Sequence, residues 1–510
     1  QINLYGLTGT GEKTEFTEDN KLINVAAIAK NTTVTDWTEV SAYFTVGDTQ
    51  YTSLALAVEF VSSSHSQPNY PTDISIDDVT VETVYPLGDV NKDGCVDILD
   101  LVRLKKIVAG ISDATDKANV NEDSEINEQD LSFLRGIMLG TYTEITVTSE
   151  SETQAYTASS LRKAFETVGN CGTVNIEGVY SVNDLLDLNT AGKSVIITGG
   201  TLDLTAMDSV ELGGNIFFKD INISWKDGSK VYAGGHTVTI GDTVNNTGIP
   251  SALYGGTRCG HSDNTNLTVL SGNFGVIYGG GERDIVFNNT NLCVGGTVNS
   301  DIDASSHSTT RLIFGGCLNG TVNGDTNLTL TGSAKANYAY AGGDSPASFV
   351  KGICNLNMCG ASVMSLYGGS RSQGNVINTK LNMTSGWCHQ VFGGSEHSGI
   401  VGSTEVNLTG GTVERRIYGG CYNEYSVGWK SNYYVTGTTT VKLGKDLIYQ
   451  GNSGLGENVV AAGSRNENKT DEVSSLYIET QDMYNSIQSK IGWSGKTSGY
   501  DDLYIAGVKQ

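Results

Sequence analysis

The chain has 510 residues, with 56 acidic and 32 basic side chains, which gives a net charge of −24. At roughly 150 residues per domain, this length is enough for about three domains. Nucleic acids and anionic membranes attract clustered Lys and Arg, so we expect neither as a partner. No apolar run approaches the roughly 18 residues that span a bilayer, and no signal peptide is recognisable. Because the first residue is Gln1 rather than methionine, we expect a mature or truncated product.

The nine cysteines are spread along the chain without a CxxC pair. An odd number of cysteines cannot pair completely within one chain. We therefore expect free cysteines that act mainly as small, buried apolar side chains.

Residues 1–86 predict antiparallel β-strands. Apolar side chains alternate along 40–46 and 54–60, which is typical of strands with one face buried and one face in water. A third run, 74–81, changes phase midway, as a β-bulge does. The pattern indicates one half of an antiparallel β-sandwich.

The runs WTEVSAYFTV, SLALAVEF and DISIDDVTVE resemble the C-terminal part of carbohydrate-binding modules of the jelly-roll kind. The resemblance implies a sugar-binding sandwich whose first strands are missing. It also implies a structural Ca²⁺ at Asp77 or Asp78, although solvated acids in a bulge explain these residues equally well. Tyr5, Trp37 and Tyr43 would stack on sugar rings or, as is commoner for aromatic residues, lie in the core.

A duplicated unit occupies residues 89–140. A shift of thirty residues places DVNKDGCVDILDLVRLKKIVAG on NVNEDSEINEQDLSFLRGIMLG. The shift superimposes Asp89 on Asn119 in the loop and Leu104 on Leu134 in the segment that follows. The duplication is a stronger signal than either copy alone.

Each copy places oxygen-bearing side chains at loop positions one, three, five, nine and twelve. This spacing lets a short loop wrap a hard cation in about six to eight oxygens, and Ca²⁺ is the usual occupant. One helix follows each loop, and none precedes the first because VYPLG interrupts the chain. The predicted ligands are Asp89, Asn91, Asp93, Cys95 (through its carbonyl), Asp97 and Asp100, then Asn119, Asn121, Asp123, Glu125, Asn127 and Asp130.

The two loops are not equivalent. Gly94 supplies a sharp turn in the first loop, whereas Ser124 stands at that place in the second, where Asn119 also replaces an acid. We therefore expect two Ca²⁺ sites, of which the second binds more weakly. The alternative is that both are ordinary solvated acidic loops.

The duplicated loop, the Asp at position twelve, the following helix and the closing glycine resemble a type I dockerin, over residues 87–141. Such a module attaches its owner to a cohesin on a scaffoldin and so builds a cellulosome, outside the cell. The family's contact positions fall on Ile98, Leu99, Lys105 and Lys106 in the first copy, and on Glu128, Gln129, Arg135 and Gly136 in the second. Because the first set begins with apolar residues and the second with polar ones, we expect the first copy to dock.

Residues 142–157 form a linker rich in Thr, Ser and Glu. The sequence SSLRKAFETVGN that follows predicts a short amphipathic helix, which starts at Ser159 or Ser160 and buries Leu161 and Phe165. A helix of this kind covers the open end of a parallel β-helix, whose backbone edge is otherwise free to pair.

Residues 158–510 repeat an aromatic residue followed by a glycine pair. The pattern occurs at 231–235, 253–256, 277–280, 313–316, 339–343, 366–369, 391–394 and 417–420, and a variant closes at 459–463. The last glycines of successive repeats are 21, 24, 36, 27, 26, 25, 26 and 43 residues apart. A period near 25 with two or three short strands predicts a parallel β-solenoid, in which stacked coils share one core. The two longest steps predict loops at 299–310 and 423–436.

The repeat predicts further details. The aromatic residues should lie in line, and the glycine pairs should turn corners with positive φ. A second strand motif, such as NLTVLSG at 266–272, lies between them, and VSSLYIETQDMYNSIQSKIG predicts a strand and a helix that close the far end. The aromatic residues are Tyr254, Tyr278, Phe314, Tyr340, Tyr367, Phe392 and Tyr418.

At the level of fold, the repeat resembles the pectate-lyase-like right-handed parallel β-helix superfamily. The predicted fold class is therefore mainly β. It consists of a C-terminal right-handed parallel β-solenoid and an N-terminal antiparallel β-sandwich, joined by a small α-helical Ca²⁺-binding module.

Acidic residues that follow glycine pairs are the candidate catalytic groups. If these corners stack, Glu282, Asp284, Asp344 and Glu396 would converge as a carboxylate pair does in sugar-cleaving enzymes. The commoner explanation is that they are solvated turn residues. The histidines show no metal-ligand spacing, and nothing resembles the catalytic motifs of polygalacturonases or pectate lyases.

Three functional hypotheses follow. The first is a non-catalytic cellulosome component that docks through Ca²⁺ and presents sandwich and solenoid surfaces to plant polysaccharide or to a cell surface. The second is an enzyme, a pectin-type lyase or glycoside hydrolase, with its active site on the solenoid. The third is a fragment of a longer enzyme of that kind. We favour the first, because regular glycine corners leave little chain for a deep cleft.

Overall fold

The computed structural model falls into two compact units, Gln1–Thr83 and Val84–Gln510. No helix in the described part of the chain is long and apolar enough to cross a membrane. The structure describes residues 2–7, 21–26, 53–58, 85, 88–121, 125–138, 144–148, 156–158, 160–182, 188–305, 311–372, 375–397, 402–422, 435–451, 459–465, 473–492 and 499–510.

The first unit contains a three-stranded antiparallel sheet in the order β2-β1-β3. Its strands are β1 (Ile2–Leu7), β2 (Lys21–Ala26) and β3 (Ser53–Val58). β3 overlaps the predicted run 54–60. The other two predicted runs, the bulge at Asp77 and Asp78, and the residues Trp37 and Tyr43 lie outside the described residues. The sandwich therefore stays a prediction.

Two helices form the predicted duplicated unit, α1 (Ile98–Val108) and α2 (Glu128–Met138). Their common core pairs residues that are thirty positions apart, such as Leu101 with Leu131 and Leu104 with Leu134. The sequence repeat is thus also a structural repeat around one small core.

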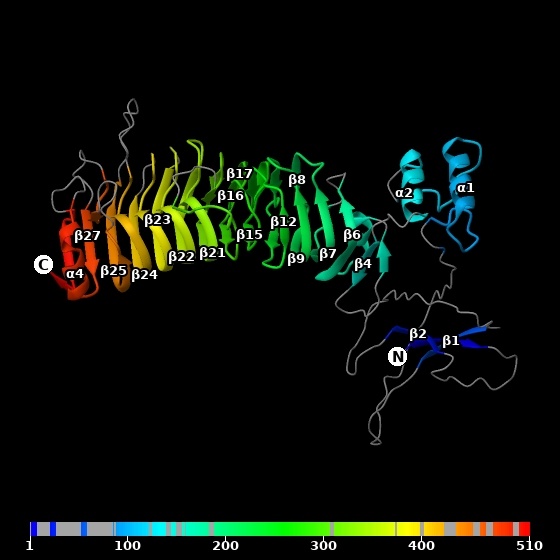
Figure 1. Cartoon of the computed structure of the whole chain (residues 1–510), viewed down its shortest axis with the longest axis horizontal. Helices are drawn as coiled ribbons and strands as arrows, with labels where there is room; N and C mark the ends of the chain where they lie inside the picture. The colour runs from blue at the N-terminus through cyan, green and yellow to red at the C-terminus, as the bar shows by residue number, and fades with distance from the viewer. Residues whose placement is uncertain are drawn as a thin grey trace, which may run out of the picture. The chain divides into compact units, whose positions relative to one another are not determined.

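A single large parallel β-solenoid of about 11 turns follows, as predicted; its strands stack side by side from β6 to β28 in Figure 1. Its strands are β6 (Gly172–Ser181), β7 (Ser194–Leu204), β8 (Ser209–Glu211), β9 (Asn215–Trp225), β10 (Lys230–Tyr232), β11 (Thr237–Ile240), β12 (Asn245–Thr247), β13 (Ala252–Tyr254), β14 (Cys259–Ser262), β15 (Thr265–Val269), β16 (Val276–Tyr278), β17 (Arg283–Val286), β18 (Thr290–Val294), β19 (Leu312–Phe314), β20 (Thr321–Val322), β21 (Thr326–Tyr340), β22 (Phe349–Tyr367), β23 (Asn375–Phe392), β24 (Ser403–Tyr418), β25 (Thr438–Tyr449), β26 (Val459–Ala461), β27 (Val473–Ile478) and β28 (Asp502–Ile505).

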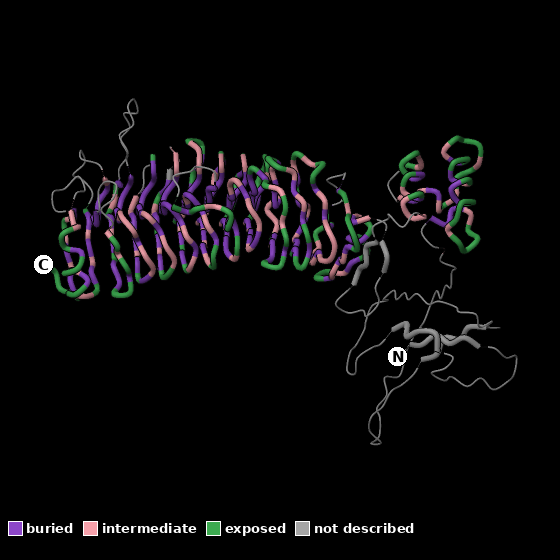
Figure 2. The backbone as a smooth tube through the Cα atoms, in the orientation of Figure 1, coloured by how far each residue is buried: buried purple, intermediate pink, exposed green. Residues whose placement is uncertain are grey.

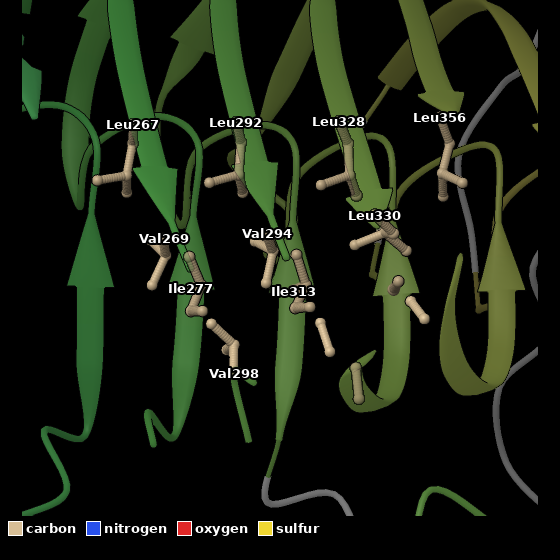
Figure 3. Close-up of a cluster of buried hydrophobic side chains, with 14 of the residues drawn as sticks. Leu267, Val269, Ile277, Leu292, Val294, Val298, Ile313, Leu328, Leu330 and Leu356 are labelled. Atoms are coloured by element: carbon tan, nitrogen blue, oxygen red, sulfur yellow. The ribbon is translucent and has the colours of Figure 1, made fainter. Parts of the chain in front are cut away.

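Equivalent residues of successive coils stack in columns through the solenoid interior. In one column Leu267 pairs in register with Leu292, which pairs with Leu328 and then Leu356. Figure 3 shows these leucines pointing the same way from neighbouring strands. Buried and less buried segments alternate along each coil in Figure 2, because successive residues of a strand face opposite sides.

The predicted aromatic stack is confirmed. From Tyr232 to Tyr418 the rings of successive coils are stacked, with centroids 4.8 to 5.5 Å apart. The stack belongs to a cluster separate from the solenoid interior. Leu253 beside Tyr254 lies in the interior cluster, so the rings line the opposite side of their strands.

The prediction that the glycine pairs turn corners with positive φ is wrong for most of them. Gly234 and Gly235 of the first pair have a positive φ. Among the described residues, no member of the later pairs, from Gly255 to Gly420, does. The coils simply approach too closely for a side chain, because a Cβ built on Gly393 would overlap the carbonyl oxygen of Gly419. Positive φ occurs instead at the glycine that closes the second strand motif. These glycines are Gly272, Gly296, Gly332, Gly360, Gly386 and Gly411.

Both ends of the solenoid are closed by short elements. At the first end, β4 (Glu144–Thr148) pairs antiparallel with β5 (Tyr156–Ala158) and with β6, and α3 (Leu161–Thr167) buries Leu161 and Phe165 in the core. Ser160 caps this helix, as one of the two predicted positions. At the other end lie α4 (Gln481–Ile487), a 3₁₀ turn (Gln488–Lys490) and β29 (Val508–Lys509), which pairs antiparallel with β28. The sequence predicted β27 and α4 but not the final hairpin.

All nine cysteines are free, as expected. Only four of them are buried, namely Cys317, Cys354, Cys388 and Cys421, so the expectation of burial fails for the rest. Burial raises the pKa of the Cys317 and Cys354 thiols to about 12. These two therefore act as apolar side chains rather than as nucleophiles.

Candidate functional site

The first predicted Ca²⁺ loop is organised around two buried carboxylates. Asp89 and Asp100 are both fully buried. Asp89 accepts hydrogen bonds from the backbone N–H groups of Asp93 (3.1 Å) and Gly94 (2.8 Å). Asp100 accepts from the backbone N–H groups of Asn91 and Asp97, both at 2.9 Å. Gly94 has a φ of 94°, as its place at the turn predicts.

The remaining first-loop residues close the same turn. The Asn91 amide donates to Asp93 (2.8 Å), and Asp97 caps α1 by accepting from the backbone N–H of Leu99 (2.7 Å). Cys95 donates its backbone N–H to Asp93 (3.0 Å). The structure thus brings the predicted side-chain ligands of the first loop together in one hydrogen-bonded turn.

The second loop repeats the position of the last ligand. Asp130 is fully buried and accepts from the backbone N–H groups of Val120 (2.7 Å), Asn121 (3.1 Å) and Asn127 (2.8 Å). Asp123 lies outside the described residues. Asn119 is only partly exposed, and Glu125 is exposed.

The residues of the first loop fit a hard divalent cation. No ion pair within the described residues neutralises Asp89 or Asp100, and burying charged carboxylates without a counter-charge is costly. A cation in the loop would offset that cost with the oxygen ligands that Ca²⁺ prefers. In the described part of the chain, no three His, Cys, Asp or Glu side chains form a ready metal cluster. The ion would therefore also need oxygens from Asn91 and from the backbone.

The predicted cohesin-contact positions lie on the surface of α1. Ile98 and Leu99 are each 57 % exposed and adjacent in sequence, so together they form an exposed apolar patch. Val102 is also exposed, as are Lys105 and Lys106. Spacings of three and four residues put these side chains on one face of the helix.

The equivalent face of α2 is polar. Glu128 and Gln129 replace the two apolar residues and are exposed, as is Arg135. The same backbone therefore displays two chemically different surfaces, one on each helix.

Three of the candidate catalytic acids lie in one column on alternate coils of the solenoid. Each accepts a hydrogen bond from a tyrosine of the aromatic stack about two coils earlier in the chain. Tyr232 donates to Glu282, Tyr278 to Asp344 (2.9 Å) and Tyr340 to Glu396 (2.5 Å).

Cations also neutralise two of these acids. Lys230 lies 3.0 Å from Glu282 and Arg371 lies 3.4 Å from Asp344, whereas Glu396 has the His397 ring 3.6 Å away. Burial alone would raise the pKa of Glu282, but the bonds from Tyr232 and Lys230 outweigh burial and lower it. Burial likewise opposes the charge of Arg371, yet Tyr340, Asp344 and Glu396 raise its pKa.

Asp284 does not share this column, contrary to expectation. It is fully buried, with Val286 on the same side of β17. Its carboxylate accepts from the Ser262 hydroxyl (2.8 Å) and from the backbone N–H of Thr257 (3.0 Å). Each of the four acids therefore has polar partners of its own, and the arrangement suits structural support better than general acid and base catalysis.

Two further side-chain ladders were not predicted from the sequence. One is a row of buried threonine hydroxyls, each donating to the carbonyl of a residue that follows a stacked aromatic ring. Its members are Thr265, Thr290, Thr326, Thr379 and Thr404. The other consists of asparagine amides that bond from coil to coil. The recurrent Thr-Asn-Leu at 265–267, 290–292 and 326–328 carried the signal in three coils only, since Lys380 follows Thr379 and Glu405 follows Thr404.

Comparison with known proteins identifies one part of the chain. Residues 87–139 match the dockerin type I domain family. The match covers α1, α2 and their loops, and no part of the solenoid. No curated protein and no solved structure matches the chain.

Proposed function

We propose that this chain is a cellulosome-type component, held outside the cell through its dockerin domain on a cohesin of a scaffoldin. The dockerin match and the exposed apolar face of α1 support this proposal. In this account the solenoid, and the sugar-binding sandwich expected in residues 1–86, are the cargo presented to plant polysaccharide.

The observation that carries the proposal is the pair Ile98 and Leu99. Large apolar side chains exposed together, with basic residues beside them, are typical of protein-binding surfaces. Lys105 and Lys106 extend the same face, so a partner surface with apolar and acidic groups would be complementary to it. The matching positions on α2 lack the apolar pair, so we infer that α1 is the docking helix.

Ca²⁺ would be held by Asp89, Asn91, Asp93, Asp97, Asp100 and the carbonyl of Cys95, and more weakly by the second loop. When bound, the ion supplies positive charge to the buried carboxylates. Asp97 caps α1 and Asp100 bonds back to the Asp97 N–H, so these residues fix where the helix starts. Chelation of Ca²⁺ should therefore weaken cohesin binding because it destabilises the start of α1, not because Ca²⁺ itself contacts the cohesin.

The direct test is binding of the full chain to a panel of cohesins, with and without Ca²⁺. The double variant Ile98→Asp plus Leu99→Asp should bind its cohesin at least about a hundredfold more weakly, because it puts charge into an apolar contact. Glu128→Ala plus Gln129→Ala changes the equivalent positions of α2 and should have little effect. If the two double variants lose binding equally, α1 is not the docking face. If no cohesin binds the wild type, the proposal fails.

The runner-up function is polysaccharide cleavage on the solenoid, either by this chain or by a longer enzyme of which it is a fragment. The bonds from tyrosines to Glu282, Asp344 and Glu396 count against it. A reducing-sugar and lyase assay on a polysaccharide panel should detect no turnover. Turnover that disappears in Asp344→Asn plus Glu396→Gln would overturn the non-catalytic account.

A further inference from the structure

A groove crosses the outer face of the last solenoid coils, over β22, β23, β24, β25, β27 and β28, at the yellow-to-red end of Figure 1. Its volume is about 540 Å³. Side chains that alternate with the buried core column line it, among them Asn382, Asn407, Lys442, Tyr477 and Tyr504. It is separate from the Ca²⁺ loops and from the acids of the aromatic stack.

The hydrogen-bonding side of the groove is a fixed row of amides. Asn382 donates to Asn357 (2.8 Å), and Asn407 donates to Asn382 (2.9 Å). A primary amide has two N–H donors and two acceptor lone pairs, and these rungs use only part of that capacity. Asn357 is exposed and Asn382 is partly exposed, so these two amides can bond to a ligand. Asn407 instead fixes the row, because its amide nitrogen donates to both Asn382 and Glu405 (3.1 Å) and its Oδ1 is buried.

The far wall of the groove is aromatic. Tyr477 and Tyr504 stack with ring centroids 4.4 Å apart and an interplanar angle of 6°. Mutual stacking holds both rings in place, so little side-chain freedom is lost when a ligand binds. Apolar ring edges next to amides and hydroxyls match sugar rings, which carry both C–H surfaces and hydroxyl groups.

The positive charge in the groove is already neutralised. Among the described lining residues the one basic side chain, Lys442, is neutralised by a 2.7 Å ion pair with Glu405, and the Glu479 carboxylate accepts only the uncharged backbone N–H of Lys445 at 2.7 Å, so it adds negative charge to the groove. No described lining residue adds a second basic group, and the chain carries a net charge of −24. These charges give an anionic polymer such as a polyuronate little attraction.

We propose that this groove binds an uncharged polysaccharide, whose hydroxyl groups bond to Asn357 and Asn382 and whose rings rest against Tyr477 and Tyr504. The inference deepens the proposed function and rests on it, since it names the place and the chemical class of the polysaccharide contact. The ligand is a neutral glycan chain, not a uronic acid polymer.

The solenoid contains its own control. A second amide row, Asn266, Asn291, Asn327 and Asn355, has the same coil-to-coil bonds at 3.0 to 3.1 Å. None of these four residues lines the groove. Asn327→Ala therefore removes two coil-to-coil bonds from a matching ladder, just as Asn382→Ala does, without touching the proposed site.

The test is affinity electrophoresis of the full chain in gels that contain soluble neutral polysaccharides (β-glucan, xyloglucan, galactomannan), with polygalacturonate as the charged arm. We expect retardation by at least one neutral polymer and none by polygalacturonate. Tyr477→Ala and Asn382→Ala should weaken the interaction about tenfold or more, whereas Asn327→Ala should not. Cohesin binding is measured on the same samples and should be unchanged in all three variants.

Three results overturn the inference: no retardation by any neutral polymer, retardation by polygalacturonate alone, or an equal loss in Asn327→Ala. If Tyr477→Ala misfolds, hydroxyl-radical footprinting of the wild type replaces it, and the bound polymer must protect Tyr477 and Tyr504. Absence of that protection also counts against the groove. Because cohesin binding is read separately, failure of the groove is distinguishable from failure of docking.

Discussion

Gly386 illustrates how a single residue position limits the spacing of the coils. Its φ is 101°, and a Cβ built on it would overlap the carbonyl oxygen of Gly360 in the preceding coil. Gly192 has a similar φ of 82°, but a Cβ there would meet nothing within 4 Å. Substitution of Gly192 would add only backbone strain, whereas substitution of Gly386 would add the same strain and an overlap with the neighbouring coil.

We therefore predict that Gly386→Ala lowers the free energy of unfolding by about 3 kcal/mol, from strain and overlap together. Gly192→Ala should cost only about 1 kcal/mol, because it adds backbone strain alone. Thermal unfolding followed by circular dichroism measures both. If both variants lost the same free energy of unfolding, the neighbouring coil would be able to move away from a side chain at position 386 at little cost.

At Glu282 the consequence is a dependence on pH. Its pKa is lowered in the folded chain by Tyr232 and Lys230, despite partial burial. A carboxyl whose pKa falls on folding stabilises the protein above its unfolded pKa, and this contribution is lost as pH falls through the folded pKa. Glu282→Gln should therefore melt at a lower temperature than the wild type at neutral pH, and the difference should shrink in acid. A difference that stays constant with pH would contradict this origin.

Among the elements, α3 depends on a residue distant in sequence. The Lys193 amine donates to the carbonyl oxygens of Phe165 (2.7 Å), Glu166 (2.9 Å) and Val168 (2.9 Å), at the C-terminal end of the helix. Carbonyls at a helix end lack partners within the helix, and a cation there also complements the helix dipole. Lys193 thereby ties the capping helix to the loop before β7.

Lys193→Met should destabilise this end of the solenoid by about 2 kcal/mol, since three charge-assisted bonds are lost. The matched control is Lys163→Met on the same helix, which removes only an exposed 3.2 Å pair with Glu166 and should cost less than about 0.5 kcal/mol. Hydrogen exchange of the α3 amides should accelerate in the first variant only. Similar exchange in both would mean that packing alone holds the helix.

The sequence predicted these elements better than the direction of their side chains. The repeat near 25 residues is enough to predict the coils and the Tyr and Phe column, and the segment SSLRKAFETVGN predicts the capping helix. It does not say which side of a strand the column occupies, because that depends on where each corner turns. Tyr254 accordingly lies outside the interior cluster while Leu253 lies within it. Asp284 was misplaced for the same reason, although alternation with Val286 would have put it inside.

The candidate sites likewise contain some features that the sequence predicted and others that it did not. The loop spacing predicted that Asp89 and Asp100 share the first loop and that Asp130 closes the second, because a tight loop leaves few alternatives. It did not predict the backbone N–H groups that bond to these carboxylates. The groove at Tyr477 and Tyr504 could not be predicted from spacing, since it joins residues from coils whose separations in sequence are irregular. The threonine and asparagine ladders fall between these cases, because their motif is visible but their bonding is not.

At the scale of the whole molecule, the dockerin core and the solenoid core share no residue. Removing Ca²⁺ should therefore unfold one without the other. We predict that a chelator increases hydrogen exchange in α1 and α2 while the strands from β6 to β28 keep their protection. A common loss of protection in both would show that the two cores unfold as one cooperative unit.

The hairpins at the two ends of the solenoid have a consequence for crowding. A parallel stack would otherwise end in rows of unpaired backbone groups, which invite a second molecule to continue it. Here the row is finished at one end by the three-residue β5 and at the other by the two-residue β29. If the proposed docking holds, many copies on one carrier would therefore not continue one another's sheets into fibres.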